Sequence, residues 1–157
     1  MRTELRRAVL ASPIVLWLLA GPAAGLEPVH LVAGFPRGQA VLETAGPRCL
    51  LIDVYFAANP EQRSQGLMYV ESLGEFEGMY FGYDSPVELV MWMKNTVLSL
   101  DMLFVGPKGT VDHIARSTQP YSTTRIGSGG IVVGVLELNA GFARRWRVET
   151  GTRLLLL

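Results

Sequence analysis

The residues LDMLFVGPKGTVDHIAR (Leu100–Arg116) give the clearest indication of how this chain folds. Leu100–Val105 form an apolar run of strand length, and Thr110–Arg116 are a second strand-like run. Gly106–Gly109 separate them with two glycines and a proline, which are residues typical of a hairpin loop. The segment therefore predicts two neighbouring strands joined by a tight connection.

Similar short strands recur along the rest of the chain, separated by turn residues. They are Gln39–Thr44, Cys49–Ala57, Met79–Phe81, Val87–Met93, Ile131–Leu138 and a final strand or hairpin within Arg147–Leu157. Ile131–Leu138 is apolar enough to be buried on both faces or nearly so. The polar segment Ser117–Gly130 is predicted to be a long loop, and loops of that length are often functional or mobile.

Helix signals are scarce. Asn59 is a capping residue, Pro60 suits the first helical position, and Gln62 follows three residues after the cap, so a helix is expected from there to about Met68. Gly66 within it indicates close packing or an early end. A second short helix is expected near Phe142. With no alternation of strands and helices, the pattern predicts an all-β barrel or sandwich with one or two short helices.

The first 25 residues are expected to be a secretory signal peptide. Three arginines precede an apolar run from about Ala8 to Ala20, and Ala23 and Gly25 are small residues at the positions that a signal peptidase needs. The alternative is an uncleaved N-terminal anchor. The prediction is therefore one exported domain of residues 26–157, in the periplasm or outside the cell, without a membrane span after cleavage.

Charge and composition narrow the classes of partner. Removing the three Arg and one Glu of the first 25 residues leaves 11 basic and 13 acidic side chains, a formal charge of −2. A protein without a basic surplus is poorly suited to a phosphate backbone, so no nucleic-acid partner is expected. The single cysteine, Cys49, excludes an internal disulfide and is expected to be a small buried apolar residue.

The usual catalytic and metal-binding motifs are missing. The two histidines, His30 and His113, and the one cysteine form no pair at metal-ligand spacing, so we expect no metal and no cofactor. No Gly-x-Ser-x-Gly motif accompanies His113, which favours a structural histidine over a serine triad. The glycines of Gly127–Gly130 lead into a strand and not into a helix, so they lack a phosphate-binding helix terminus.

Several polar residues stand among apolar ones, and they are the best guide to a site. Arg63 lies on the predicted helix, Lys94 and Asn95 follow Trp92, and Asp101 and Glu137 lie within apolar strands. An isolated buried charge is very unfavourable, so these groups must be paired or line a wet pocket. One interpretation is internal ion pairs that fix the helix on the sheet. The other is a cleft in which the same groups meet a ligand, where two carboxylates can act as acid and base.

Three stretches resemble a known family. QRSQGLMYVESLGEFEGMYFGY, MWMKNTVLSLDMLFVGPKGTV and VLELNAGFARRW are similar to the bacterial and archaeal family called domain of unknown function 192. The matching motifs fall on Arg63, Gly66–Met68, Gly78–Phe81, Trp92–Thr96, Leu100–Met102 and Leu136–Gly141. The resemblance covers about Leu50–Leu156. It implies a mainly β, compact barrel-like or jelly-roll-like sandwich with short helices, often behind a signal peptide, and no established function.

This chain departs from the usual family pattern at Ser99, Val70 and Thr152. Val70 replaces a common arginine, which weakens any expectation of an arginine pair at the site.

The leading hypothesis is an exported β-domain that binds a small polar ligand or an envelope partner at a cleft near the Trp-Met-Lys-Asn-Thr segment. The residues expected to line or brace it are Arg63, Trp92, Lys94, Asn95, Asp101, Tyr121 and Glu137. One alternative is a hydrolase that uses Asp101 and Glu137 as acid and base. The other is a structural or interaction module whose buried charges serve only as scaffold.

Overall fold

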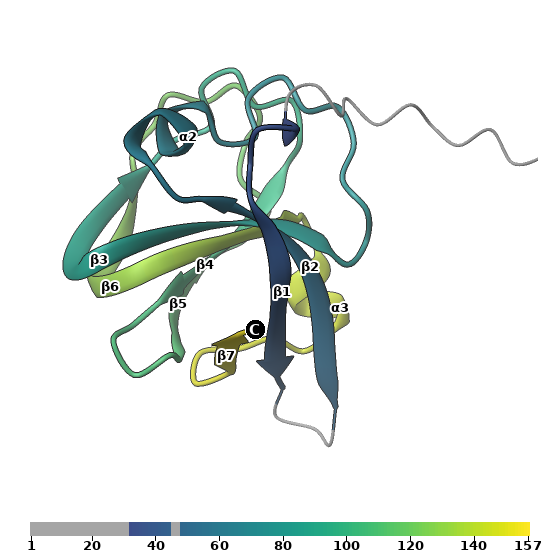
Figure 1. The fold of residues 1–157 in the computed structure, drawn as a ribbon, viewed down its shortest axis with the longest axis vertical. Coiled ribbons are helices and arrows are strands. Elements are labelled where there is room, and N and C mark those ends of the chain that lie inside the picture. Colours follow the sequence, from purple (N-terminus) through teal and green to yellow (C-terminus); the bar gives the residue numbers. More distant parts are fainter. Residues whose placement is uncertain (1–31, 45–47) are drawn as a thin grey trace, which may run out of the picture.

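The structure, a computed structural model, describes residues 32–44 and 48–157 (Figure 1). The predicted signal peptide lies outside the described residues. Seven strands form a single sheet in the order β5-β4-β6-β3-β2-β1-β7. The elements are β1 (Arg37–Glu43), β2 (Cys49–Ala57), α2 (Pro60–Gln65), β3 (Glu77–Met91), β4 (Leu100–Val105), β5 (Val111–Ala115), β6 (Ile126–Asn139), α3 (Phe142–Arg145) and β7 (Arg153–Leu156). Within the described residues, the mainly β fold with two short helices is confirmed.

The sheet curls into a half-barrel whose two edges approach each other at one end (Figure 1). An isolated bridge joins Thr110, beside β5, to Arg153 at the start of β7. The Leu154 N–H donates to the Gly109 carbonyl at 2.8 Å, and the Val111 N–H donates to the Thr152 carbonyl at 2.8 Å. The predicted hairpin loop therefore also links the first and last strands of the sheet.

Apolar residues fill both faces of the central strands. All six residues of β4 are buried. Met102 and Phe104 belong to a cluster on the face that carries α2, whereas Leu103 and Val105 belong to a cluster on the opposite face, which carries α3. The prediction of burial on both faces for Ile131–Leu138 holds from Gly134 onward, because Ile131 itself is exposed.

Two sequence predictions about the long strands are wrong. Met79–Phe81 and Val87–Met93 are not separate strands, because β3 runs through the polar residues between them. Register shifts against β6 absorb the extra residues, and bulges of this kind let a strand continue through a stretch whose composition resembles a loop. Similarly, the predicted loop Ser117–Gly130 ends at Arg125, since β6 begins at Ile126.

The two predicted features of Gly66 are both present. Helix α2 ends there and does not continue to Met68, with Gly66 at a φ of 49° and its N–H donating to the Gln62 carbonyl at 2.8 Å. A side chain at this position would also lie 3.1 Å from the Phe81 ring. The prediction that Cys49 is buried is wrong: it begins β2 and is exposed, because the alternation of the strand points the neighbouring Leu50 into the core.

Candidate functional site

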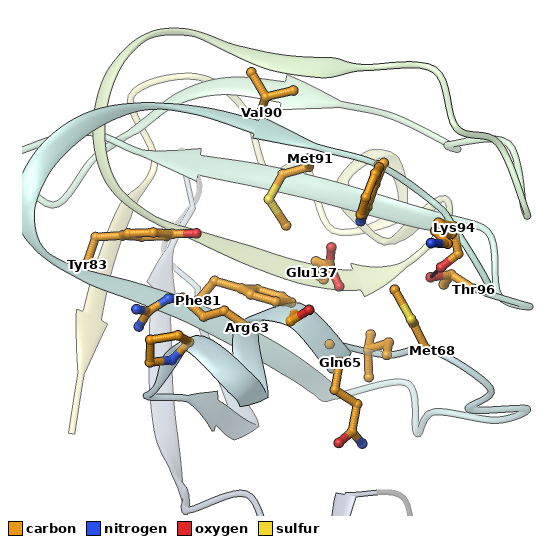
Figure 2. A pocket seen from close by; sticks show the side chains of 15 residues that line it. Arg63, Gln65, Met68, Phe81, Tyr83, Val90, Met91, Lys94, Thr96 and Glu137 are labelled. Atoms are coloured by element: carbon orange, nitrogen blue, oxygen red, sulfur yellow. Dashed lines mark hydrogen bonds between the residues drawn. The ribbon is translucent and has the colours of Figure 1, made fainter.

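A cleft of about 350 Å³ opens on the face of the sheet that carries α2 (Figure 2). Helix α2 and the residues after it form one wall, the segment Val90–Thr96 forms the other, and β3 and β6 contribute Phe81 and Glu137. Four of the seven predicted site residues line this cleft: Arg63, Trp92, Lys94 and Glu137.

Arg63 is held at one end of the cleft by α2. Its Nη1 donates to the Ala58 carbonyl at 3.2 Å and to the Gly82 carbonyl at 3.3 Å. Its guanidinium carbon lies 4.9 Å from the centre of the Tyr83 ring. The position of Arg63 depends on where α2 begins. The Asn59 side chain accepts the Gln62 N–H at 2.8 Å and so caps the start of α2.

Lys94 lies at the other end of the cleft, as Figure 2 shows, on a tight turn between β3 and β4. Its Nζ is 5.4 Å from the centre of the Trp92 ring. The turn is closed by the Thr96 N–H, which donates to the Met93 carbonyl at 3.1 Å, and by Asn95, whose φ is 56°. The expectation that Lys94 is embedded in apolar surroundings is wrong, since this turn leaves it exposed.

Glu137 lies between these two ends, on β6 (Figure 2). It pairs in register with Met79 and Met102, so its side chain projects from the face that carries α2. Only 4% of the residue is exposed, and its carboxyl makes no hydrogen bond to any other described residue. Burial raises the pKa of Glu137 from 4.5 to about 8, so the carboxyl is mostly protonated at neutral pH.

The cations of the cleft have no carboxylate partner in the described part of the chain. Ion pairs there join Arg37 to Glu77, Arg145 to Glu75 and Arg153 to Glu43, at exposed or half-exposed positions, and none involves Arg63 or Lys94. The interpretation that Arg63, Lys94, Asp101 and Glu137 pair with one another is therefore wrong. With Glu137 protonated, the cleft carries two positive charges and no negative one among its lining residues.

Asp101 lies on the opposite face of the sheet. It pairs in register with Leu138, the neighbour of Glu137, and successive residues of a strand point to opposite faces. Its Oδ1 accepts the Ser117 N–H at 2.8 Å, and its Oδ2 accepts the Ala143 N–H of α3 at 2.9 Å. Asp101 thus fastens α3 to β4. Asp101 and Glu137 cannot act as the acid and base of one cleft, which removes the basis of the hydrolase alternative.

Asn95 and Tyr121 support the turn without lining the cleft. The Asn95 carbonyl accepts the Tyr69 N–H at 2.9 Å, and the Asn95 side chain donates to Met68 Sδ at 3.8 Å. The Tyr121 N–H donates to the Thr96 carbonyl at 3.1 Å. The turn is therefore held from both sides by backbone hydrogen bonds.

Sequence reasoning missed several residues that line the cleft. They are chiefly Met68, Phe81, Tyr83 and Met91. Phe81 and Met68 lie in the motifs that carry the family resemblance, and this was the signal that could have identified them. Tyr83 ends one of the stretches that carry the resemblance but lies outside the matching motifs, and its segment resembles a loop. Among the described residues, no group of three or more His, Cys, Asp or Glu is placed to hold a metal ion.

The chain matches the model of DUF192, a family described as "Uncharacterized ACR", over residues 40–156. One similar crystal structure is that of a protein from Sinorhizobium meliloti 1021 described as a candidate transcription regulator. Its sequence is 40% identical, the TM-score is 0.76, and the match covers 78% of this chain and 95% of that chain. Another is that of a protein of unknown function from Novosphingobium aromaticivorans DSM 12444. Its sequence is 32% identical, the TM-score is 0.76, and the match covers 84% of this chain and 94% of that chain. No curated protein matches the chain.

Proposed function

The chain belongs to the DUF192 family, and we propose that it binds a small, negatively charged polar ligand in the cleft between Arg63 and Lys94. The observation that carries the proposal is the charge of the cleft. Two cations face it, neither has a carboxylate partner among the described residues, and the one acidic residue of the lining is mostly uncharged at neutral pH. An anion entering the cleft meets positive charge at both ends and no repulsion from its floor.

The lining of the cleft supports a small-molecule ligand. Its volume falls at the lower end of the range of about 300–1,000 Å³ that is usual for ligand pockets. Phe81, Tyr83 and Trp92 supply apolar surface, while Glu137 and the two cations supply a few polar groups. This mixture of apolar walls with a small number of polar contacts is typical of sites that orient a ligand.

We further propose that the protein is exported, with residues 1–25 as a cleaved signal peptide. The proposal rests on the arginines, apolar run and small residues of that segment. Among the described residues, no helix is long and apolar enough to cross a membrane. N-terminal sequencing of the protein from an envelope fraction tests this: a start near Leu26 supports cleavage, and a start at Met1 contradicts it.

Regulation of transcription, the role suggested for the Sinorhizobium relative, has less support here. The whole sequence has 14 basic and 14 acidic side chains, so it lacks the surplus of positive charge that usually accompanies DNA binding.

A thermal-shift measurement tests ligand binding. The compounds are a galacturonate disaccharide, glucarate, citrate, AMP, inorganic phosphate and, as a neutral compound, cellobiose. The proteins are the wild type, Lys94→Met, Arg63→Met and, as a matched control, Lys108→Met at the other lysine of the chain, which is exposed on the β4–β5 loop.

We expect at least one anion to raise the melting temperature of the wild type and of Lys108→Met, and to raise it much less in the two cleft variants. If no anion shifts the wild type, or if the shift is the same in all four proteins, the proposal is wrong.

A further inference from the structure

We propose that the ligand is a short acidic oligosaccharide, with room in the cleft for about two sugar units. This inference rests on the proposed function, because it names the chemical class that the same cleft would take. It is carried by a repeated arrangement: at each end of the cleft a cation lies against an aromatic ring, Arg63 with Tyr83 and Lys94 with Trp92.

The two ends of the cleft are separate, so a single carboxylate cannot satisfy both cations. Figure 2 shows Arg63 beside Tyr83 at one end, Lys94 at the other, and Glu137 between them. An elongated ligand with a negative group near each end matches this arrangement of charge. A chain of two sugar acids has this form, since each ring carries one carboxylate.

The aromatic rings suit sugars as well as charge. Trp92 is 51% exposed, although it lines the cleft. The face of an aromatic ring is electron-rich, so it attracts the weakly positive C–H groups on the flat side of a pyranose ring. An exposed indole beside a lysine can therefore hold the ring of a sugar acid while the lysine meets its carboxylate.

Glu137 fits a hydroxyl-rich ligand. A protonated carboxyl can donate one hydrogen bond and accept others, as a sugar hydroxyl does. Because the Glu137 carboxyl makes no hydrogen bond to the described residues, its hydrogen-bonding capacity is available to a ligand in the cleft. Its place between the two cations corresponds to the hydroxyl-bearing middle of such a ligand.

The backbone around Lys94 is held in an unusual conformation. Tyr69, Asn95 and Tyr121 have φ values of 63°, 56° and 60°, and the amides of the two tyrosines bond to the consecutive carbonyls of Asn95 and Thr96. Left-handed conformations are unfavourable for bulky residues and tend to gather at functional sites. Here Asn95 lies on the turn that presents Lys94, and the two tyrosines bond to that turn, which supports a binding role for this end of the cleft.

A phosphate ligand is the competing interpretation. Phosphate sites usually present several free backbone N–H groups. Around this turn the N–H groups of Tyr69, Met93, Thr96 and Tyr121 donate to backbone carbonyls, whereas those of Lys94 and Asn95 have no backbone acceptor among the described residues. A nucleotide is therefore included in the test as a competing ligand.

Isothermal titration calorimetry of the full exported chain tests the inference. The probes are galacturonate disaccharide, galacturonate, cellobiose, AMP and glucarate, which is an acyclic diacid with hydroxyls but no ring. We expect the acidic disaccharide to bind at least tenfold more tightly than each of the others. Trp92→Leu should weaken it about tenfold, and Trp92→Phe, which retains a ring, should restore part of the loss.

The outcomes separate this inference from the proposed function. If glucarate binds as tightly as the disaccharide and Trp92→Leu has no effect, the sugar-acid class is wrong while anion binding stands. If AMP binds most tightly, the ligand is a nucleotide and the inference is overturned. If no anion binds, both proposals fail. Because Trp92 is half exposed, the melting temperature of Trp92→Leu should stay near that of the wild type, and this confirms that the variant is folded.

Discussion

Glu137 is the residue on which the electrostatics of the cleft depend. It is buried among apolar side chains such as Met79 and Met102 and carries a proton at neutral pH. If the same carboxyl were ionised, its negative charge would oppose an anionic ligand. The protonation of this one side chain thus determines whether the lining carries a net charge of +2 or of 2 − 1 = +1.

Glu137→Gln should change how stability depends on pH. Below pH 4.5 the carboxyl is protonated in both the folded and the unfolded chain. Between pH 4.5 and about 8 the unfolded chain releases the proton and the folded chain keeps it, so the wild type loses up to about 1.4 kcal/mol of unfolding free energy per pH unit. Above this range the loss stops. Glutamine has no ionisable proton, so the unfolding free energy of the variant does not fall in this way. Glu137→Gln should therefore become the more stable protein toward pH 8.

Urea unfolding at pH 4, 6 and 8 measures this difference, with Glu88→Gln as a control at an exposed glutamate of β3. Parallel pH profiles for the wild type and Glu137→Gln would show that Glu137 does not have a raised pKa.

Asp101, unlike Glu137, should stabilise the fold without contributing to ligand binding. In the wild type, the N–H groups of Ser117 and Ala143 each donate to one carboxylate oxygen of Asp101. In Asp101→Asn, one of these N–H groups faces an amide NH₂ and loses its acceptor. We expect a loss of about 2–3 kcal/mol in the free energy of unfolding and less than a twofold change in ligand affinity. Asp84→Asn, at an exposed aspartate, is the matched control for stability. Weaker binding by folded Asp101→Asn would place Asp101 in the site and contradict this assignment.

Residue types in the sequence predicted four of the residues that line the cleft. Arg63, Lys94 and Glu137 were predicted because a polar group in an apolar context needs a reason to be there. Trp92 was predicted as an apolar wall, and all four residues line the cleft. The same argument failed for Asp101. A carboxylate that binds backbone N–H groups and one that faces a cleft have the same sequence signature. Only the pairing register of β4 with β6 separates them.

Among the elements, α2 and the turn before β4 position the two cations. Helix α2 has only six residues, so its start matters more than its intrinsic helix propensity. Asn59 accepts the Gln62 N–H, and the Gln62 side chain accepts the Ala58 N–H at 2.9 Å, which forms a reciprocal cap. The residues of this cap were recognisable in the sequence, and the helix begins where they predict.

Removing the cap should weaken both the helix and the cleft. Asn59→Ala should lower the free energy of unfolding by about 1 kcal/mol and reduce anion affinity, because Arg63 is held by the helix that the cap starts. Asn59→Ser retains an acceptor and should behave like the wild type. Chemical denaturation and calorimetry on the two variants check the prediction. Equal unfolding free energies and equal anion affinities for Asn59→Ala and Asn59→Ser would show that the cap contributes nothing.

Strand boundaries were predicted well only where composition changed sharply. The bounds of β2 and β4 match the prediction, since turn residues or polar residues flank each apolar run. For β3 the prediction failed, because register shifts between Gly82 and Val87 let the strand continue past exposed residues, and such shifts leave no mark in composition. That failure also concealed Tyr83, which lies within this region.

Apolar clusters on both faces of one curled sheet stabilise the whole molecule. The last strand, β7, connects the two edges of this sheet. Strand β7 pairs with β1 on one side and meets the β4–β5 loop on the other. Mainly β architecture was predictable from the recurrence of short strands. The closure was not, because a contact between Thr110 and Arg153 depends on the curl of the whole sheet and has no local signal.

Two adjacent leucines of β7 test the importance of this closing strand. Leu154 is 5% exposed and lies in the core cluster on the face that carries α3, whereas Leu155 is 37% exposed. Leu154→Ala should lower the free energy of unfolding by about 2–4 kcal/mol. Leu155→Ala, the matched control, should change it by less than about 1 kcal/mol. Equal losses by urea denaturation would contradict the burial of one face of β7.

The central claim is that the cleft between Arg63 and Lys94 binds an anion, and mapping amide chemical shifts by NMR is its most direct test. ¹⁵N-labelled protein is titrated with the anionic compound that gives the largest thermal shift. We predict that the perturbed amides cluster on α2, on the Trp92–Thr96 segment and around Glu137. Perturbations centred on Asp101 and α3, or spread over the surface without saturation, would contradict the claim.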